Sequence, residues 1–267
     1  MINFFRKKRK KLADDNKALK YVRYAIGEIV LVVIGILIAL QINTWNEESR
    51  NKRIERSFYS DVLDDLKNDI EKLDNQTFYY KNRIENLGWL LQKIKNPDLE
   101  ISPIEFGKRI EPLYYDNKAI SYASTFDASK SSGTFISFKN KELLKDLTQY
   151  YANFEELEGR INSTSSFIGD QLEPMMFTLP LNYLTAETNE LVITSEGDSN
   201  SELYKFIASF EDKRNLNLDI KTFIQKSGFE NYVIGDLGRS FNVISTIEKR
   251  KTRTLEISNE IKLFLND

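Results

Sequence analysis

An apolar run of eighteen residues from Ala25 to Ile42, AIGEIVLVVIGILIALQI, constrains this chain more than any other feature. As a helix the run would be about 27 Å long at about 1.5 Å per residue, close to the thickness of the hydrocarbon core of a bilayer. Aromatic residues flank both of its ends, where amphipathic rings favour the headgroup region: Tyr21, Tyr24 and Trp45. The run therefore predicts a transmembrane helix over residues 24–44 with these three residues as interfacial anchors.

Basic residues are distributed unevenly about this run. Nine precede it, six of them between Arg6 and Lys11, whereas the four that follow up to Ser60 are mixed with three glutamates. Because basic flanks stay in the cytoplasm, we expect residues 1–23 to form a cytoplasmic tail and residues 45–267 an extracytoplasmic domain. For a bacterial chain, this arrangement predicts a single-pass inner-membrane protein with a periplasmic C-terminal domain. The tail could also bind anionic lipid headgroups, although its topogenic role alone accounts for it.

Two other interpretations of the apolar run are a cleaved signal peptide and a buried core helix. A cleaved signal peptide also has a basic start and an apolar centre, but this run is long for one and no small-x-small cleavage site follows Ala39. A buried core helix is the other alternative, and the basic cluster and aromatic ends argue against it. We therefore expect an uncleaved anchor.

Glu28, Gly35 and Ala39 share a face of the predicted transmembrane helix, and Gly27 lies adjacent to it. Small residues let a second helix approach closely, and an intramembrane glutamate could pair with a partner group. This face predicts helix packing with a second copy or with a partner membrane protein. The alternative, which we favour, is that Glu28 reaches the nearby cytoplasmic interface beside Arg23 and that the glycines are incidental.

Composition excludes several kinds of chemistry. The chain has no cysteine and no histidine, so disulfides, thiolate nucleophiles, Ser-His-Asp triads and histidine-based metal sites are absent. Its 38 basic and 40 acidic residues give a net charge of −2, which does not indicate a nucleic-acid partner. We expect no enzymatic activity, no bound metal and no cofactor.

Helical periodicity dominates the remainder of the chain. No proline occurs between Trp45 and Pro97, and apolar residues from Ile70 onward recur at alternating spacings of three and four, which predicts one helix from the membrane to Asn96. The seam of this helix is expected to comprise Ile70, Leu73, Thr77, Tyr80, Ile84, Leu87, Leu91 and Ile94.

Further helices are expected along the chain. A short one follows the capping-box residue Ser102, and a second covers about Ala119–Lys130 before the Ser131–Gly133 break. A long helix capped by Asn140 continues to Pro174, and another covers about 230–265. The stripe of that last helix is expected to include Val233, Leu237, Phe241, Ile244, Ile247, Leu255, Ile261 and Leu265. Between these two helices we expect a short strand at 190–194 and helices at about 202–212 and 218–226. The predicted fold is all-α: a transmembrane helix continuing into an antiparallel bundle of three long and several short helices.

The segment Gly27–Glu47, GEIVLVVIGILIALQINTWNE, resembles an uncharacterised family of bacteroidete single-pass membrane proteins. The Ser131–Phe135 break is similar to that family, and so is Asn140–Leu143, which leads into Tyr150 and Tyr151. The resemblance implies a bacterial envelope protein with no assigned activity. It carries no catalytic residue over to this chain.

Two groups of oxygen ligands could bind a cation. Asp61, Asp65 and Asp69 share one helical face, but nearby lysines make a solvated face the favoured interpretation. The polar segment from Asp198 to Glu202 is similar to a calcium loop, but it lacks the glycine required for the sharp turn, so a plain loop is favoured. Paired tyrosines such as Tyr150-Tyr151 could line a ligand pocket, although core packing is the commoner role.

These observations favour a membrane-anchored interaction or structural protein whose molecular function the sequence does not specify. The runner-up is an extracytoplasmic ligand-binding module that acts through a partner membrane protein. The expected partners are the lipid bilayer and a second copy or another membrane protein contacted through the transmembrane helix.

Overall fold

The computed structural model is described here over residues 18–115, 118–180, 205–207, 209–211, 213–214 and 219–266. The described residues contain helices and turns and no strand, which confirms the predicted all-α class. Several sequence predictions lie outside the described residues. They concern the basic tail, the side chain of Tyr21, the strand at 190–194, the polar segment 198–202, and parts of the helices expected at 202–212 and 218–226.

The chain divides into two compact units, which are described separately. One comprises Met1–Ser57 with Ile136–Lys139, and the other comprises Phe58–Phe135 with Asn140–Asp267. Helix α2 is continuous from Ala18 to Lys95 and contributes residues to both units. Its end at Lys95 confirms the predicted stop before Asn96 and Pro97.

The first unit contains the apolar segment of α2. Its most apolar window has a mean hydropathy of 2.6, and none of that window is buried inside the protein. Among the described residues this is the single helix with the length and composition needed to cross a membrane. Further along this unit, the backbone N–H of Lys139 donates to Glu55 Oε2 at 3.1 Å, which ties the segment 136–139 to α2.

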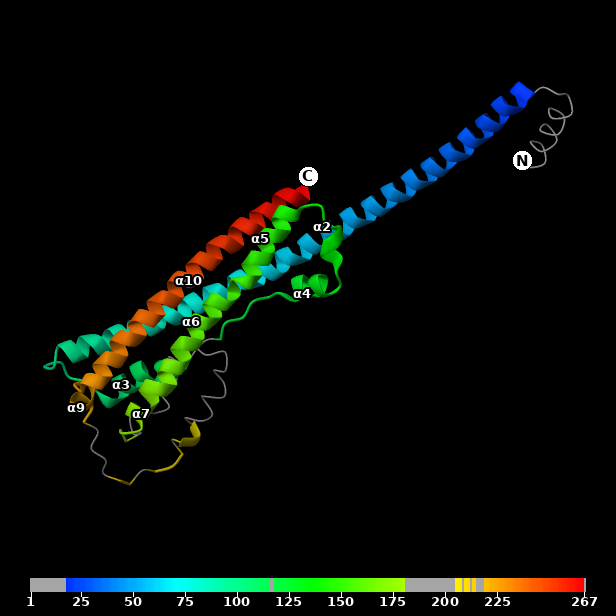
Figure 1. Cartoon of the computed structure of the whole chain (residues 1–267). Coiled ribbons are helices and arrows are strands. Elements are labelled where there is room, and N and C mark those ends of the chain that lie inside the picture. Colours follow the sequence, from blue (N-terminus) through cyan, green and yellow to red (C-terminus); the bar gives the residue numbers. More distant parts are fainter. Residues whose placement is uncertain are drawn as a thin grey trace. The chain divides into compact units, whose positions relative to one another are not determined.

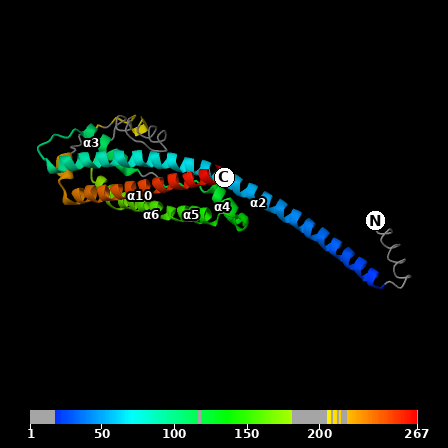
Figure 2. The same ribbon diagram turned by 90° about the horizontal axis from the view of Figure 1, so that it is seen from above.

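In the second unit, α2 packs beside α10 (Ser227–Asn266), and α5 (Lys141–Ala152) and α6 (Phe154–Phe167) form a third wall (Figures 1 and 2). Helix α10 runs opposite to α2, since early residues of α10 contact late residues of α2 and late residues contact early ones. Three helical walls with short helices at their ends confirm the predicted bundle.

Short elements connect the walls: α3 (Pro103–Ile110), η1 (Glu111–Tyr114), α4 (Ser124–Ser131), η2 (Thr134–Ser137), η3 (Ile168–Leu172), α7 (Glu173–Met176) and α9 (Ile220–Ile224). Ser102 accepts a hydrogen bond from the Glu105 N–H at 3.1 Å, and Asn140 accepts one from the Leu143 N–H at 3.1 Å, so both predicted N-caps are confirmed. The chain turns between α4 and η2 at Gly133, whose φ of 73° suits glycine.

The predicted seam of α2 was wrong by one residue at every second position. Asp69, Gln76, Arg83 and Leu90 are buried, whereas Ile70, Thr77, Ile84 and Leu91 are only half-buried. The other four predicted seam residues are buried as expected: Leu73, Tyr80, Leu87 and Ile94. The buried positions still alternate at spacings of three and four, but polar residues at a seven-residue interval occupy three of them. Apolar periodicity pointed to the neighbouring stripe because buried polar residues interrupt the apolar pattern. Asp69 and Arg83 are paired with charges on α10, and Gln76 Nε2 donates to the Lys118 carbonyl at 3.0 Å.

Two predicted helices differ from the observed ones. The helix expected from Ala119 begins at Ser124. The Tyr122 N–H donates to Asp69 before the helix starts, and the Thr125 N–H in the first turn of α4 donates to Asp65. The helix expected from Asn140 to Pro174 is interrupted at Asn153 and then widens into the π-helical turn η3. In this turn the Glu173 N–H bonds the Ile168 carbonyl, which accommodates Pro174 without an internal donor.

The predicted stripe of α10 was only partly correct. Val233, Ile247 and Ile261 are buried, but Phe241 and Leu255 are about half-exposed. The places of the missing apolar residues are taken by buried polar ones: Asp236, Ser240, Arg250, Thr254 and Ser258. The interior between α2 and α10 is therefore a mixture of apolar layers and polar contacts.

Candidate functional site

The first buried polar contact joins α2 to α10 through Arg83 and Asp236. Arg83 Nε donates to Asp236 Oδ1 at 3.0 Å and Nη2 donates to Oδ2 at 2.6 Å, with both side chains at most 1% exposed. The same guanidinium donates to the carbonyls of Tyr115 at 3.0 Å and Leu113 at 3.1 Å. Burial lowers the pKa of Arg83, but the effects of Asp236, Tyr79 and Tyr232 together outweigh it, and the net pKa lies above the usual value.

Further donors complete the coordination of Asp236. The Tyr232 hydroxyl donates to Asp236 Oδ2 at 2.6 Å, and the Ser240 hydroxyl donates to Oδ1 at 3.2 Å. Burial raises the pKa of Tyr232, which keeps this phenol protonated as a donor. A buried ion pair costs least when hydrogen bonds satisfy its remaining groups, as they do here. This contact joins α2 to α10, and because its polar groups already have partners, it has no open position for a ligand.

The second buried contact between these helices has its charges exchanged, with the acidic residue on α2 and the basic residue on α10. Asp69 of α2 lies 3.4 Å from Arg250 of α10, and it also accepts from the Tyr150 hydroxyl at 2.6 Å and the Tyr122 N–H at 2.7 Å. Ser121 Oγ donates to Asp69 Oδ2 at 3.1 Å. The interpretation of this acidic face as solvated was wrong for Asp69, whose carboxylate is 1% exposed.

The other aspartates of that face have different environments. Asp65 is half-buried and accepts from the Thr125 N–H at 3.1 Å, whereas Asp61 is exposed. Within the described ranges, no group of three acidic side chains is arranged to hold a metal ion. On this face, the Asp65 and Asp69 carboxylates accept hydrogen bonds from the segment where α4 begins.

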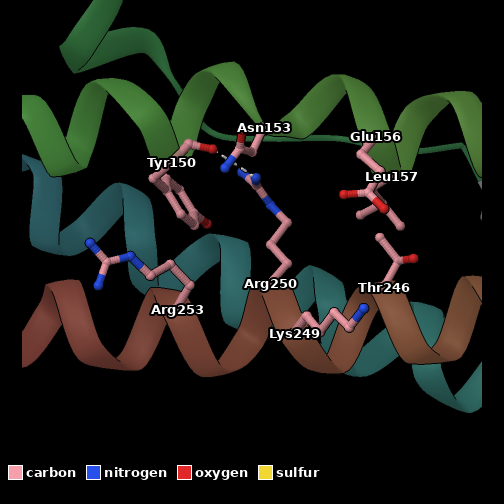
Figure 3. A pocket seen from close by; sticks show the side chains of 8 residues that line it. All are labelled: Tyr150, Asn153, Glu156, Leu157, Thr246, Lys249, Arg250 and Arg253. Atoms are coloured by element: carbon pink, nitrogen blue, oxygen red, sulfur yellow. Dashed lines mark hydrogen bonds between the residues drawn. The ribbon is translucent and has the colours of Figure 1, made fainter.

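Arg250 also bonds the backbone at the end of α5. Its Nη1 donates to the Tyr150 carbonyl at 3.0 Å, and its guanidinium lies 4.0 Å from the centre of the Tyr150 ring (Figure 3). In an uninterrupted helix, that carbonyl would accept from the N–H of Phe154. A cation at a helix C-terminus stabilises free carbonyls, so Arg250 explains why α5 ends at Ala152 although the sequence there has neither glycine nor proline.

A cleft of about 130 Å³ opens beside this helix break. Figure 3 shows Arg250 extending from α10 to the break, with Tyr150 on one side and Asn153 close to the guanidinium. The cleft is lined by Tyr150, Asn153, Glu156, Leu157, Thr246, Lys249, Arg250 and Arg253. It is the candidate site, because it combines cationic groups, an interrupted helix and a buried polar network.

Sequence reasoning singled out one lining residue of this cleft, Tyr150, and missed the others. It treated the tyrosine pair as core packing, and Tyr150 is indeed 2% exposed with its hydroxyl bonded to Asp69. Tyr151 likewise donates to the Tyr122 carbonyl at 3.2 Å. A signal for Arg250 was present: it occupies a position of the buried α10 stripe where an apolar residue is expected.

The residues predicted to pack in the membrane lie on the exposed segment of α2. An added Cβ at Gly27 or Gly35 would meet nothing within 4 Å, and Trp45 is 71% exposed. Glu28 is half-buried and Ala39 is exposed. Within the described part of the chain, nothing packs against Gly27 or Gly35, so the packing role of this face stays a prediction.

A comparison with protein families matches residues 28–168 to a family of unknown function, DUF6090. The match covers more than half of the 267 residues. The chain belongs to DUF6090. The match spans Asp69, Arg83 and Tyr150, and it ends before their α10 partners. No curated protein and no solved structure matches the chain.

Membership in DUF6090 agrees with the expected kinship to an uncharacterised family. The bacteroidete source and the anchor motif implied by the sequence resemblance stay predictions. Because the family has no assigned activity, the geometry of the chain itself has to carry any functional argument.

Proposed function

We propose that this protein is a single-pass membrane-anchored interaction protein of the bacterial cell envelope. The observation that carries the proposal is the apolar segment of α2, which is helical, unburied and continuous with the helix that forms one wall of the bundle. An unburied apolar segment of this length is stable in a bilayer and unstable in water. The basic tail stays in the cytoplasm and the bundle is exposed to the periplasm.

Anchoring and topology have a direct test, because the chain contains no cysteine and a single introduced thiol can be labelled selectively. Ser245→Cys places a thiol on an exposed position of α10, and Ala13→Cys places one in the tail. A membrane-impermeant maleimide should label the Ser245→Cys protein in intact spheroplasts and the Ala13→Cys protein only after lysis. Labelling of Ala13→Cys alone in intact spheroplasts, or extraction of the chain by alkaline carbonate, would contradict the proposal.

The interaction itself would involve a second copy or a partner membrane protein packed on the face with Gly27, Glu28, Gly35 and Ala39. Leucine at Gly35 and Ala39 should abolish cross-linking within the membrane, because bulky side chains keep the helices apart. The matched control is Ile36→Leu with Leu40→Ile, which conserves volume on other faces of the same helix. Equal cross-linking by all three proteins would exclude this face as the contact.

A second candidate function is an extracytoplasmic ligand-binding module that acts through a partner. The cleft beside the α5–α6 break favours it, because interrupted helices lined by polar groups are common at binding sites. We propose no catalytic activity and no nucleic-acid partner, since the chain lacks histidine and cysteine and its charge is balanced. Hydrolysis of an envelope polymer by the purified protein, lost on changing one carboxylate, would overturn that part of the proposal.

A further inference from the structure

The cleft at the α5–α6 break contains hydrogen-bond donors that the fold leaves unused. Arg250 donates through Nη1 and Nη2 to Tyr150, Asp69 and Ser121, and no described residue accepts from its Nε–H. The Asn153 side chain caps neither adjoining helix and has no hydrogen bond in the described part of the chain. Both side chains line the cleft.

Lys249 is the uncompensated charge of the cleft. It is exposed and forms no ion pair with any described residue. The other charged groups are matched: Arg250 by Asp69, Arg253 by Asp146 at 3.1 Å, and Glu156 by Arg160 at 2.9 Å.

The remaining lining offers an occupant little apolar surface. Leu157 is 1% exposed and Tyr150 is 2% exposed, so both lie behind the wall of the cleft. A volume of about 130 Å³ is well below that of sites for drug-sized ligands, and it equals only a few water molecules at roughly 30 Å³ each. The occupant must therefore be small.

We propose that this cleft binds a small monocarboxylate. The carboxylate would accept hydrogen bonds from Lys249, Asn153 and the Nε–H of Arg250. One unmatched positive charge favours a monoanion over a doubly charged phosphate. The proposal specifies the ligand class of the ligand-binding alternative, on which it rests, and it is independent of the membrane anchor.

The test uses the full-length chain in detergent micelles, with ¹³C-labelled propanoate as the probe and saturable binding followed by NMR. Propanoate should bind, and Lys249→Gln should weaken binding about tenfold, because the carboxylate would lose the one unmatched cation of the cleft. Asn153→Ala should weaken it to a smaller extent. The matched control is Lys262→Gln, an exposed lysine of α10 that lies outside the cleft and should leave affinity unchanged.

Four outcomes would overturn the proposal. Three are the absence of saturable propanoate binding, binding that Lys249→Gln does not weaken, and equal binding of the neutral analogue propanamide. The fourth is tighter binding of inorganic phosphate than of propanoate, which would refute the choice of a monocarboxylate. A negative result in these binding experiments would not affect the thiol-labelling test of the membrane anchor. The ligand-binding proposal and the anchoring proposal can therefore fail independently.

Discussion

Arg83 and Asp236 form a bidentate ion pair between α2 and α10, and the pair Asp69–Arg250 repeats the contact with its charges exchanged. Arg83 lies fourteen residues after Asp69 on α2, and Arg250 lies fourteen residues after Asp236 on α10. The two contacts therefore share one antiparallel register. A slip by seven residues would leave these charges facing apolar side chains such as Val243, and a slip by fourteen would set like charges together. The paired charges therefore specify the alignment of the two helices.

The first prediction concerns Arg83. Arg83→Met should lower the free energy of unfolding by about 3–5 kcal/mol, because Asp236 would remain buried without its counter-charge. Combining it with Asp236→Leu should recover much of the loss, since two apolar residues replace the pair. The measurement is urea unfolding of the full-length chain in detergent. The exposed pair Arg160–Glu156 is the control, and Arg160→Met should cost at most about 1 kcal/mol. If Arg83→Met and Arg160→Met lowered the free energy of unfolding by similar amounts, the buried pair would contribute no more to stability than the exposed pair.

The second prediction concerns the hydroxyl of Tyr150. Tyr150→Phe should destabilise the chain by about 1–3 kcal/mol, because the buried carboxylate of Asp69 loses its donor at 2.6 Å. Tyr122→Phe is the matched control: the N–H of Tyr122 also bonds Asp69, but its side chain is 40% exposed. We expect that variant to stay within about 0.5 kcal/mol of the wild type in the same unfolding experiment. Equal stabilities of the two variants would contradict the assigned hydrogen bond.

The third prediction is a pH dependence arising from Glu111. Burial raises the pKa of Glu111 from 4.5 to about 7, against the opposing effect of the hydrogen bond from Tyr115. The folded chain therefore holds more protons than the unfolded chain between these values, so stability falls as pH rises through this range. The loss should be on the order of 3 kcal/mol at the upper limit.

Glu111→Gln should remove this dependence, because the amide does not titrate. Unfolding curves at pH values from about 4 to 8 measure the effect. The exposed Glu85→Gln should keep the wild-type profile. A profile that is identical in all three proteins would exclude Glu111 as its source.

The fourth prediction compares two glycines of α10. An added Cβ at Gly235 would lie 2.8 Å from Cζ of Phe167, a ring held between the Arg239 guanidinium at 3.7 Å and the stacked Tyr232 ring. Gly235→Ala should therefore cost about 1–3 kcal/mol, because the ring has little room to move. Gly238→Ala meets nothing within 4 Å and should stabilise the helix by about 1 kcal/mol. Stabilisation by both substitutions, measured as melting temperature, would refute the predicted clash.

Local sequence signals succeeded where the structure depends on neighbouring residues. The apolar run beside the basic tail, the absence of breakers up to Pro97, and the caps Ser102 and Asn140 all led to elements that the structure contains. These features depend on backbone hydrogen bonding and short-range periodicity, which a few consecutive residues determine.

Sequence periodicity gave wrong predictions where burial or a helix end depends on residues far away along the chain. The Asp69 face was interpreted as solvated, because a carboxylate on a helix gives no local sign that Tyr150 and Arg250 will satisfy it. The helix break at Asn153 also had no local signal, since the cation that bonds the Tyr150 carbonyl lies 100 residues further along the chain.

The sequence by itself determined that this chain is helical, that its first helix has the length and composition to cross a bilayer, and that histidine or cysteine chemistry is excluded. The tertiary structure alone decided which polar residues are buried, where α5 ends, and that a cationic cleft forms beside Arg250. The physical reason is that burying a charge is unfavourable unless a specific partner meets it, and only the folded chain brings Asp69 to Arg250 and Arg83 to Asp236.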